Sequence, residues 1–174
     1  LLGNFKNENN GVLIKSNIKK KIQVKSIAPK EIKQMPWRGH LGINLTPELI
    51  PILKKSKSTL IFTNTRSQCE LWYQKLLEQM PELAGDMAMH HGSIDRNIRL
   101  WVENAVRNEK IKVVVCTSSL DLGVDFDPVE SIVQIGGPKG VARFIQRAGR
   151  SGHRPNEVSK IYFLPTHAIE LIEA

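Results

Sequence analysis

The chain has 174 residues, of which 41% are hydrophobic, and it carries 25 Lys and Arg against 17 Asp and Glu. This length fits one domain of ordinary size, and the hydrophobic fraction excludes a wholly disordered chain. No apolar stretch approaches the roughly 20 residues of a membrane-spanning helix, and the polar residues 1–15 hold no secretory signal. Cys69 and Cys116 match no metal spacing, so we expect reduced core residues of a cytosolic protein. Because the sequence begins with Leu1, we expect a part of a longer polypeptide.

The net charge of +8 is concentrated in two blocks. Residues 1–36 hold 8 basic and 2 acidic residues, and residues 139–160 hold 6 basic and 1 acidic, whereas residues 37–138 are nearly neutral. Basic blocks suit contacts with a polyanion, because counterion release favours Lys and Arg beside phosphates. A solvated basic face that keeps the protein soluble is the alternative, and composition alone favours it.

The first third of the chain gives few regular patterns. Residues 1–20 show no periodicity and are rich in Asn and Lys, which predicts an arm or linker before a folded domain at residues 21–174. Residues 21–27 alternate between apolar and polar side chains, which predicts a half-exposed strand at a sheet edge. Thr46 before Pro47 predicts an N-cap and a helix that ends near Lys55.

From residue 58 onward, strand and helix patterns alternate, which predicts an open α/β domain with a mainly parallel sheet and helices on both faces. The predicted strands are residues 59–63, 87–90, 111–116, 131–135 and 158–164. The predicted helices are residues 69–80, a helix capped by Ser93, residues 141–148, and a last helix from residue 167. The expected apolar face of the helix after Ser93 is Ile94, Ile98, Trp101, Val102 and Ala105.

Ligands of open α/β sheets bind in the loops at the carboxyl ends of strands. The loops in question here are residues 64–67, 91–93, 117–125 and 149–154. They are rich in small polar residues, Gly and Arg, which is the chemistry that phosphates require.

The last of these loops follows an arginine-rich helix. Helical spacing puts Arg143, Gln146, Arg147 and Arg150 on one face. We expect the helix to dock through Phe144, Ile145 and Ala148 and to present its arginines. Gly149 is expected to end the helix, so that the Arg150 guanidinium can reach a phosphate; an exposed basic helix end is the alternative.

Hydroxyl groups follow the buried strand at residues 111–116. Thr117 and its serine neighbours can grip a nucleic-acid phosphate, Gly123 permits close backbone approach, and Asp125 can accept a hydrogen bond from a ribose hydroxyl. A serine-rich turn in which Asp125 and Asp127 are ordinary turn residues is the alternative.

Two further loops carry weaker signals. Asn64 or Thr65 can cap the following helix, whose exposed N–H groups would also suit a phosphate. His90 and His91 are adjacent on a strand and point to opposite faces, so they cannot chelate one metal ion, and we expect a loop that presents amides to a nucleic-acid backbone.

Taken together, four segments resemble motifs of the second RecA-like motor domain of superfamily 2 helicases. FTNTR (62–66) resembles motif IV, HHGS (90–93) motif IVa, CTSSLDLGVD (116–125) motif V, and QRAGRSGH (146–153) motif VI. The resemblance covers roughly residues 20–174. SSLDLG, GRSGH and PWRGHLG (36–42) resemble the large helicase-related (Lhr) group, and within it the ligase-associated DEXH-box helicases of bacterial DNA repair.

The resemblance implies that ATP binds in a cleft between two RecA-like domains, with this chain as the second domain. Arg150 matches the motif VI arginine that reaches the γ-phosphate, and Gln146 matches a residue near the attacking water. Gly123, Asp125 and His153 match positions on the nucleotide side. His153 stands where many relatives have a second arginine, and because a neutral imidazole lacks a permanent charge, Arg147 or Arg154 could share the work of Arg150.

The resemblance also implies a set of residues that contact the nucleic-acid backbone. Its expected members are Thr117, Ser118, Asn64, Thr65, Arg66, Gly92 and Ser93. The implied ligand is single-stranded DNA or a 3′-tailed duplex, bound without sequence preference. The implied setting is the bacterial cytoplasm beside the nucleoid, with DNA ligase or nuclease repair partners.

The sequence has neither a GxxxxGK[ST] phosphate loop nor a DExH motif, and GGPKG (136–140) is not such a loop. The Mg²⁺ of Mg-ATP must then be held by a first RecA-like domain of the same polypeptide, and we expect no ATPase from this chain alone. Two alternatives stay open. One is a nucleic-acid-binding module that needs no nucleotide, and the other is a small-molecule α/β enzyme, which lacks a credible nucleophile.

Overall fold

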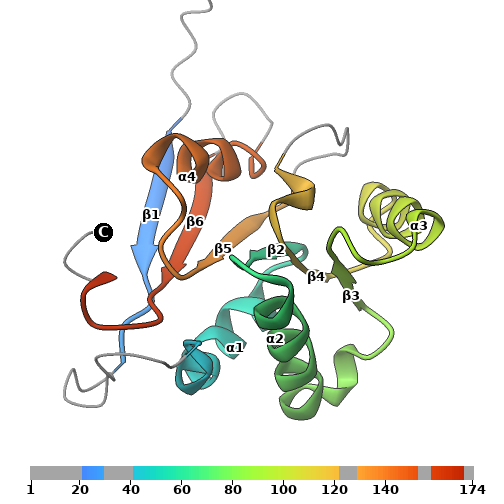
Figure 1. Ribbon diagram of the computed structural model, residues 1–174, viewed down its shortest axis with the longest axis horizontal. Coiled ribbons are helices and arrows are strands. Elements are labelled where there is room, and N and C mark those ends of the chain that lie inside the picture. The colour runs from blue at the N-terminus through green and yellow to red at the C-terminus, as the bar shows by residue number, and fades with distance from the viewer. Residues whose placement is uncertain (1–20, 30–40, 122–128, 153–157, 171–174) are drawn as a thin grey trace, which may run out of the picture.

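The computed structural model describes residues 21–29, 41–121, 129–152 and 158–170 (Figure 1). Six strands form one sheet in the order β1-β6-β5-β2-β4-β3, and every pair of neighbours is parallel. The predicted α/β class with a parallel sheet is therefore confirmed. The sheet is all parallel across the six strands described.

The strands occur where the sequence predicts them. Their bounds are β1 (Ile22–Ser26), β2 (Thr59–Phe62), β3 (Met87–His90), β4 (Val113–Cys116), β5 (Ser131–Ile135) and β6 (Ser159–Leu164). The inner strands β2, β4 and β5 are buried along their whole length, as continuous apolar runs predict. In contrast, β1 lies at the edge of the sheet, as predicted, but all five of its residues are exposed, so the predicted half-exposed pattern was wrong.

Helices cover both faces of the sheet (Figure 1). Their bounds are α1 (Thr46–Lys55), α2 (Arg66–Gln79), α3 (Arg96–Arg107) and α4 (Val141–Ala148). One core cluster joins α1 and α2 to side chains such as Ile61 and Val115, and a second joins α3 and α4 to Leu60 and Val114. Successive strand residues thus face opposite layers, as a pleated strand requires.

Two predicted helix caps were wrong. Thr46 is the first residue of α1 rather than its cap, because its amide closes a preceding 3-10 turn on the Ile43 carbonyl and its hydroxyl donates to the same carbonyl, so that it accepts from no helix amide. Asp95, not Ser93, caps α3, and its carboxylate accepts a hydrogen bond of 2.8 Å from the Asn97 amide. The carboxylate is as good a cap as a hydroxyl, and the pattern did not distinguish them.

The predicted apolar face of α3 was also partly wrong. Val102 and Ala105 are buried, but Ile98 is 54% exposed and Trp101 is 62% exposed. Since α3 packs on the edge strand β3, only a narrow stripe of the helix meets the sheet.

Residues 41 and 42 are fixed against the core. The Trp72 indole N–H donates to the Leu41 carbonyl at 2.8 Å, and Trp72 is fully buried. Gly42 has φ of +72°, and a Cβ there would lie 2.6 Å from Leu164 Cδ2. Two features therefore favour glycine at this position: the positive φ angle and the absence of space for a side chain. In the part of the chain that the structure describes, no helix is long and apolar enough to span a membrane.

Candidate nucleotide and nucleic-acid site

Three loops that the sequence predicts to contact nucleic acid lie beside one another. They follow β2, β4 and β3, which are neighbours in a parallel sheet, so their carboxyl ends meet at one edge. The loops contribute Asn64, Thr65 and Arg66, then Thr117 and Ser118, then Gly92 and Ser93. All of these residues are exposed except Thr117, which is 9% exposed.

Main-chain hydrogen bonds hold the three loops in register beyond the ends of the strands. The Thr63 amide donates to the Cys116 carbonyl at 2.8 Å, and the Thr117 amide donates to the His90 carbonyl at 3.2 Å. The ladder thus continues by one residue on each side of β4. A ligand that lies across these loops would meet a surface of fixed geometry.

The loop after β2 is built around the start of α2. Thr65 is the cap, since its hydroxyl accepts from the Gln68 amide at 3.1 Å, and the Gln68 side chain accepts from the Asn64 amide at 2.9 Å. This exchange is a capping box shifted by one residue. The Asn64 side chain donates to the Gly137 carbonyl at 3.0 Å and so joins this loop to the loop after β5.

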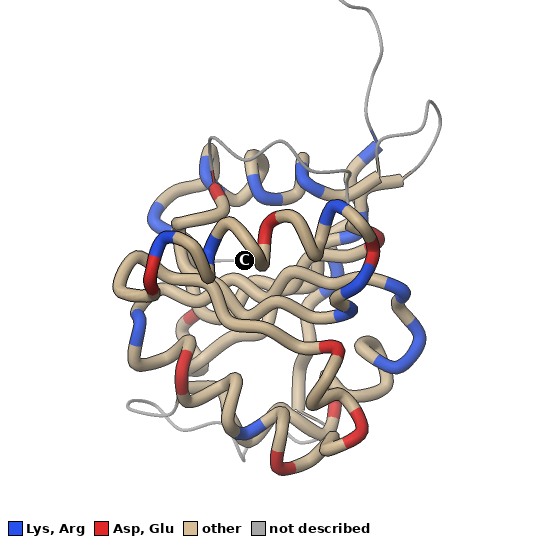
Figure 2. Tube along the Cα trace, turned by 90° about the vertical axis from the view of Figure 1, so that its right-hand side faces the viewer, with Lys and Arg blue, Asp and Glu red and all other residues tan. Residues whose placement is uncertain are grey.

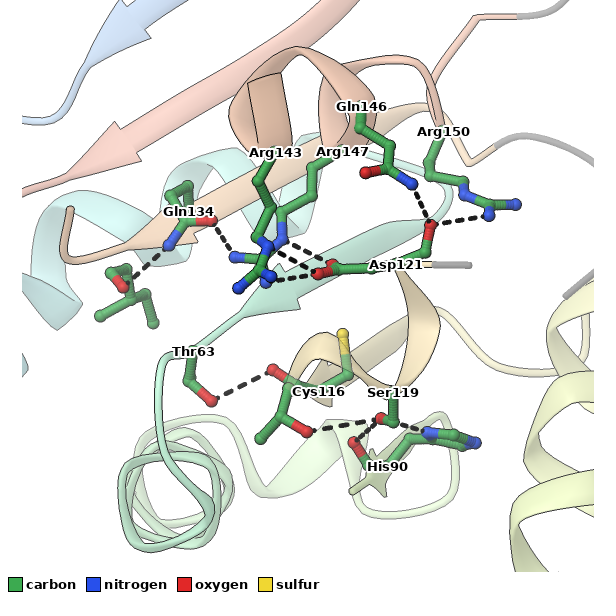
Figure 3. A network of polar contacts seen from close by, with 12 residues as sticks. Thr63, His90, Cys116, Ser119, Asp121, Gln134, Arg143, Gln146, Arg147 and Arg150 are labelled. Atoms are coloured by element: carbon green, nitrogen blue, oxygen red, sulfur yellow. Dashed lines mark hydrogen bonds and ion pairs between the residues drawn. The ribbon is translucent and has the colours of Figure 1, made fainter. Parts of the chain in front are cut away.

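Asp121 is the centre of the second part of the site (Figure 3). It follows a 3-10 turn (Ser118–Leu120) that leaves β4, and only 5% of it is exposed. The Arg147 guanidinium grips its carboxylate in a fork, with Nε to Oδ1 at 2.7 Å and Nη2 to Oδ2 at 3.0 Å. Paired donors of this kind give both strength and a fixed orientation.

Further side chains of the arginine-rich segment reach the same residue (Figure 3). The Asp121 main-chain carbonyl accepts from Arg150 Nη2 at 2.9 Å and from Gln146 Nε2 at 3.2 Å. Arg143 Nε lies 3.5 Å from Asp121 Oδ2. Asp121 was not predicted to be a site residue. A carboxylate just after the hydroxyl turn was the available signal, but the residues that it binds lie 22 to 29 positions further along the chain.

The expectation that α4 presents all its arginines outward was wrong for Arg147. This residue is 2% exposed, its guanidinium lies 4.5 Å from the centre of the Phe62 ring, and it also donates to the Gln134 side chain. Ile145, which was expected to dock, is 52% exposed. A guanidinium can face a sheet when a carboxylate and an aromatic ring compensate for lost water.

Arg150 connects the two residues that flank the segment 122–128. Its side chain donates to the carbonyl of Asp121, and its own carbonyl accepts from the Val129 amide at 3.2 Å. Val129 and Ser151 also form an isolated parallel bridge. The predicted nucleotide residues Gly123, Asp125 and His153 lie outside the described residues, as does Arg154.

His90 and His91 both have partners within the protein. The two ring nitrogens of His90 lie 2.7 Å from Ser119 Oγ and 3.1 Å from Glu103 Oε1. Nδ1 of His91 accepts from the Ser93 amide at 3.3 Å. Burial lowers the pKa of His90 below its ordinary value, although the hydrogen bond and charge of Glu103 oppose the shift.

The two cysteines are poor nucleophiles. Both thiols are fully buried, and burial raises the pKa of Cys69 to about 12 and that of Cys116 well above its ordinary value. Only a thiolate attacks efficiently, so neither thiol suits covalent catalysis near neutral pH.

The basic block at residues 139–160 is less positive in space than in sequence. Asp121 neutralises Arg147, and Glu130 Oε1 lies 3.4 Å from Lys160 Nζ. Figure 2 shows basic and acidic residues interspersed along the described trace, with Lys and Arg prevailing in the upper half of the view. The charge pattern alone therefore does not identify a binding face.

Comparisons with known proteins agree with the fold. The family described as "Helicase conserved C-terminal domain" matches residues 43–154. The ATP-dependent helicase Lhr-Core protein 2 of Thermococcus barophilus is 40% identical over 129 residues, which cover 74% of this chain and 15% of that protein. The Lhr-Core helicase of Methanocaldococcus jannaschii is 35% identical over 163 residues, 92% of this chain and 19% of that protein.

Solved structures give the same result. The Mycobacterium smegmatis helicase Lhr, bound to ssDNA and AMP-PNP, matches with a TM-score of 0.78 at 27% identity, over 88% of this chain and 21% of that chain. The yeast DEAD-box splicing factor Prp28 matches with a TM-score of 0.68 at 21% identity, over 93% of this chain and 33% of that chain, and shares the fold.

The chain spans less than a fifth of the length of the two Lhr-Core relatives. The family match covers more than half of the chain, and the Lhr likeness predicted from the sequence is confirmed. The narrower likeness to ligase-associated helicases stays a prediction. The chain therefore belongs to the helicase conserved C-terminal domain family, as the second RecA-like domain of a superfamily 2 helicase of the Lhr group.

Proposed function

We propose that this chain is one half of an ATP-driven motor that moves along single-stranded DNA. It supplies the arginine finger and a track of backbone contacts, while a first RecA-like domain holds Mg-ATP. The observation that carries the proposal is the position of Arg150, which bonds both to Asp121 within motif V and to Val129 beyond it. A helix that only gripped phosphates would not need this connection between motifs V and VI.

Arg150 suits the finger better than Arg147 does. The Arg147 guanidinium already donates two hydrogen bonds to the Asp121 carboxylate inside the domain. If Arg147 moved to a nucleotide, the Asp121 carboxylate would stay buried without its charged partner. Arg150 donates to a neutral carbonyl, and a phosphate oxygen is a stronger acceptor for the same guanidinium. Gln146 is exposed and shares that carbonyl, so it would sit beside the same phosphate.

The residues of this chain fit the phosphates of ATP but not its metal ion. Arg150 and Gln146 offer N–H donors, which suit phosphate oxygens. The Asp121 carboxylate is neutralised by Arg147, so it is a poor ligand for Mg²⁺. The Mg²⁺ ion would therefore be held by the first domain, which would also supply the water-activating residues.

The three neighbouring loops would bind the DNA strand through phosphate and sugar. The exposed residues Ser93 and Ser118 carry hydroxyls, and the exposed Gly92 carries an amide, which are donors of the kind that such contacts use. Binding of this type does not read the bases, and its affinity falls with salt. A role in DNA repair beside a ligase or nuclease, in the bacterial cytoplasm near the nucleoid, stays a prediction from the family resemblance.

The finger is tested in a protein that joins this chain to a first RecA-like domain. Arg150→Ala should lower kcat for ATP by about 10³-fold or more while DNA binding persists. Arg143→Ala is the matched control, because Arg143 contacts the same Asp121 from a half-exposed position at 3.5 Å and should leave kcat within about threefold. A loss below tenfold for Arg150→Ala would move the finger role to another residue.

The DNA track is tested separately with Thr117→Ala. This variant should raise the DNA concentration needed for half-maximal ATPase stimulation, while the basal ATPase rate is kept. If the basal and stimulated rates fell together, Thr117 would not be a DNA contact. The chain alone should show no magnesium-dependent ATP turnover, and clear turnover would contradict a divided active site.

A nucleic-acid-binding module without nucleotide dependence is the second candidate, and the exposed loops after β2, β3 and β4 are compatible with it. It predicts that adding the first domain and a nucleotide analogue leaves DNA affinity unchanged. The motor predicts a change in affinity, because nucleotide and DNA then bind to the same pair of domains.

A further inference from the structure

We propose that His90 is a positioning residue, which holds the Thr117–Ser119 turn against β3 and α3 so that its hydroxyl groups meet the DNA backbone. This inference rests on the proposed function of the three loops. His90 itself would not touch DNA, since it is 1% exposed.

The His90 imidazole is clamped from two sides. Its Nδ1 lies 2.7 Å from Ser119 Oγ, and its Nε2 lies 3.1 Å from Glu103 Oε1 on α3 (Figure 3 shows Ser119 and the ring). One side chain at the end of β3 thus joins the turn after β4 to the helix that follows the β3 loop. We call this chain of contacts, Glu103–His90–Ser119, the relay.

The relay ends on the hydroxyl groups that are expected to contact DNA. Thr117 Oγ1 donates to Ser119 Oγ at 3.5 Å, and the Thr117 amide donates to the His90 carbonyl at 3.2 Å. Thr117 is 9% exposed, so a small displacement of the turn decides whether its hydroxyl can reach a ligand. Ser118 lies between these two residues and is exposed.

All the hydrogen bonds of the relay can form whether the His90 ring is neutral or charged, without movement of heavy atoms. In the neutral ring, Nε2–H donates to the Glu103 carboxylate and Nδ1 accepts the Ser119 O–H. In the charged ring, Nδ1–H donates to Ser119 Oγ, and the Ser119 O–H turns to the His90 carbonyl, 2.9 Å away. Because burial disfavours the charged ring, we expect the neutral ring protonated on Nε2 at pH 7.

The main test measures binding of this chain to a fluorescently labelled oligo-dT strand by anisotropy. Ser119→Ala removes the end of the relay without adding bulk, and His90→Phe keeps a ring but no nitrogen. Each should weaken binding by about 3- to 10-fold, the effect of losing one or two net hydrogen bonds. Glu103→Gln should have a smaller effect, since an amide oxygen still accepts the Nε2 proton.

The matched control is Ser131→Ala. Its buried hydroxyl bonds to Ser56 and Thr59 at 2.9 Å each, at the opposite ends of the strands, so its loss should leave DNA affinity unchanged. A second comparison measures the effect of Ser119→Ala in a protein that already carries Thr117→Ala. If the relay acts through Thr117, adding Ser119→Ala to this background should cause little further loss.

A structural role unrelated to DNA would give a different result. In that case Ser119→Ala and Ser131→Ala would both lower thermal stability and leave affinity unchanged, and the proposal would be overturned. Additive losses in the double variant would also overturn it. If His90→Phe does not fold, Ser119→Ala carries the test alone.

The relay can also be tested in the absence of DNA, by NMR of the His90 ring. Nitrogen-15 shifts of the His90 ring should report a neutral imidazole protonated on Nε2 at pH 7, and Glu103→Ala should change this signature. A neutral ring protonated on Nδ1 would contradict the relay. Absence of any oligo-dT binding by the unaltered chain at low salt would instead refute the proposed function on which the relay rests.

Discussion

Asp121→Asn should strongly destabilise the domain, although the new side chain has the same shape. The substitution removes the charge that balances Arg147, whose side chain is 2% exposed, and it sets an NH₂ group against guanidinium donors. Breaking a buried ion pair by removing one partner costs about 3–5 kcal/mol, because the other charge stays buried. For a domain with a total stability of about 5–15 kcal/mol, this loss is a large fraction.

Urea unfolding measures the effect directly. With a slope of about 2 kcal/mol per M, a loss of about 4 kcal/mol would move the midpoint down by about 2 M. Replacing both partners, as in Asp121→Leu with Arg147→Met, should restore most of the stability, since a buried pair can be exchanged for packed apolar groups at little net cost. Arg143→Gln, at the half-exposed contact, should cost less than about 1 kcal/mol. A loss below about 1 kcal/mol for Asp121→Asn would refute the view that Arg147 depends on this carboxylate.

Three further predictions concern other parts of the chain. Gly42→Ala should lower the free energy of unfolding by about 2–4 kcal/mol in urea, because of its φ of +72° and its contact with Leu164; Gly85→Ala, with nothing within 4 Å, should change it by less than about 0.5 kcal/mol. Burial raises the pKa of Cys69 to about 12 in the folded chain, whereas in the unfolded chain the thiol has its ordinary pKa of 9.0. The contribution of Cys69 to stability should therefore fall as pH rises above 9, by up to about 1.4 kcal/mol per pH unit, and Cys69→Ala should make the total fall less steep; an unchanged slope would show that the thiol is not involved. Thr65→Asp should keep the α2 cap but weaken DNA binding by charge repulsion, whereas Thr65→Ala should cost about 1 kcal/mol of stability; equal DNA affinities for Thr65→Asp and wild type would remove this loop from the DNA track.

The inner strands β2, β4 and β5 could be predicted because each one is a short apolar run that the fold covers on both sides. Val113, Val114 and Val115 are β-branched, consecutive and buried, and this pattern has few structural alternatives. The position of the loops after β2, β3 and β4 at one edge of the sheet followed from the same reasoning, since parallel strands place their carboxyl ends at one edge. The order of the strands within the sheet was not predicted, because it depends on long-range pairing that local patterns do not record.

The arrangement around Asp121 could not be predicted from the sequence. Helical spacing put Arg147 on one face with Arg143 and Arg150, but spacing does not show which face turns toward the sheet. The answer depends on a carboxylate 26 positions earlier in the chain and on the ring of Phe62. The exposure of Trp101 was missed for a similar reason, since periodicity identifies an apolar stripe but not the number of neighbours available to cover it.

The attachment of Arg150 limits how this domain could take part in ATP hydrolysis. Its backbone is joined to Val129, which precedes β5 by two residues, so it cannot advance without carrying the end of a central strand. The side chain donates to the Asp121 carbonyl, so its reach from that backbone is short. A nucleotide held elsewhere must then be brought to the guanidinium by approach of two whole lobes. Such a machine would couple each hydrolysis step to rigid-body closure, because a loop cannot deliver the charge on its own.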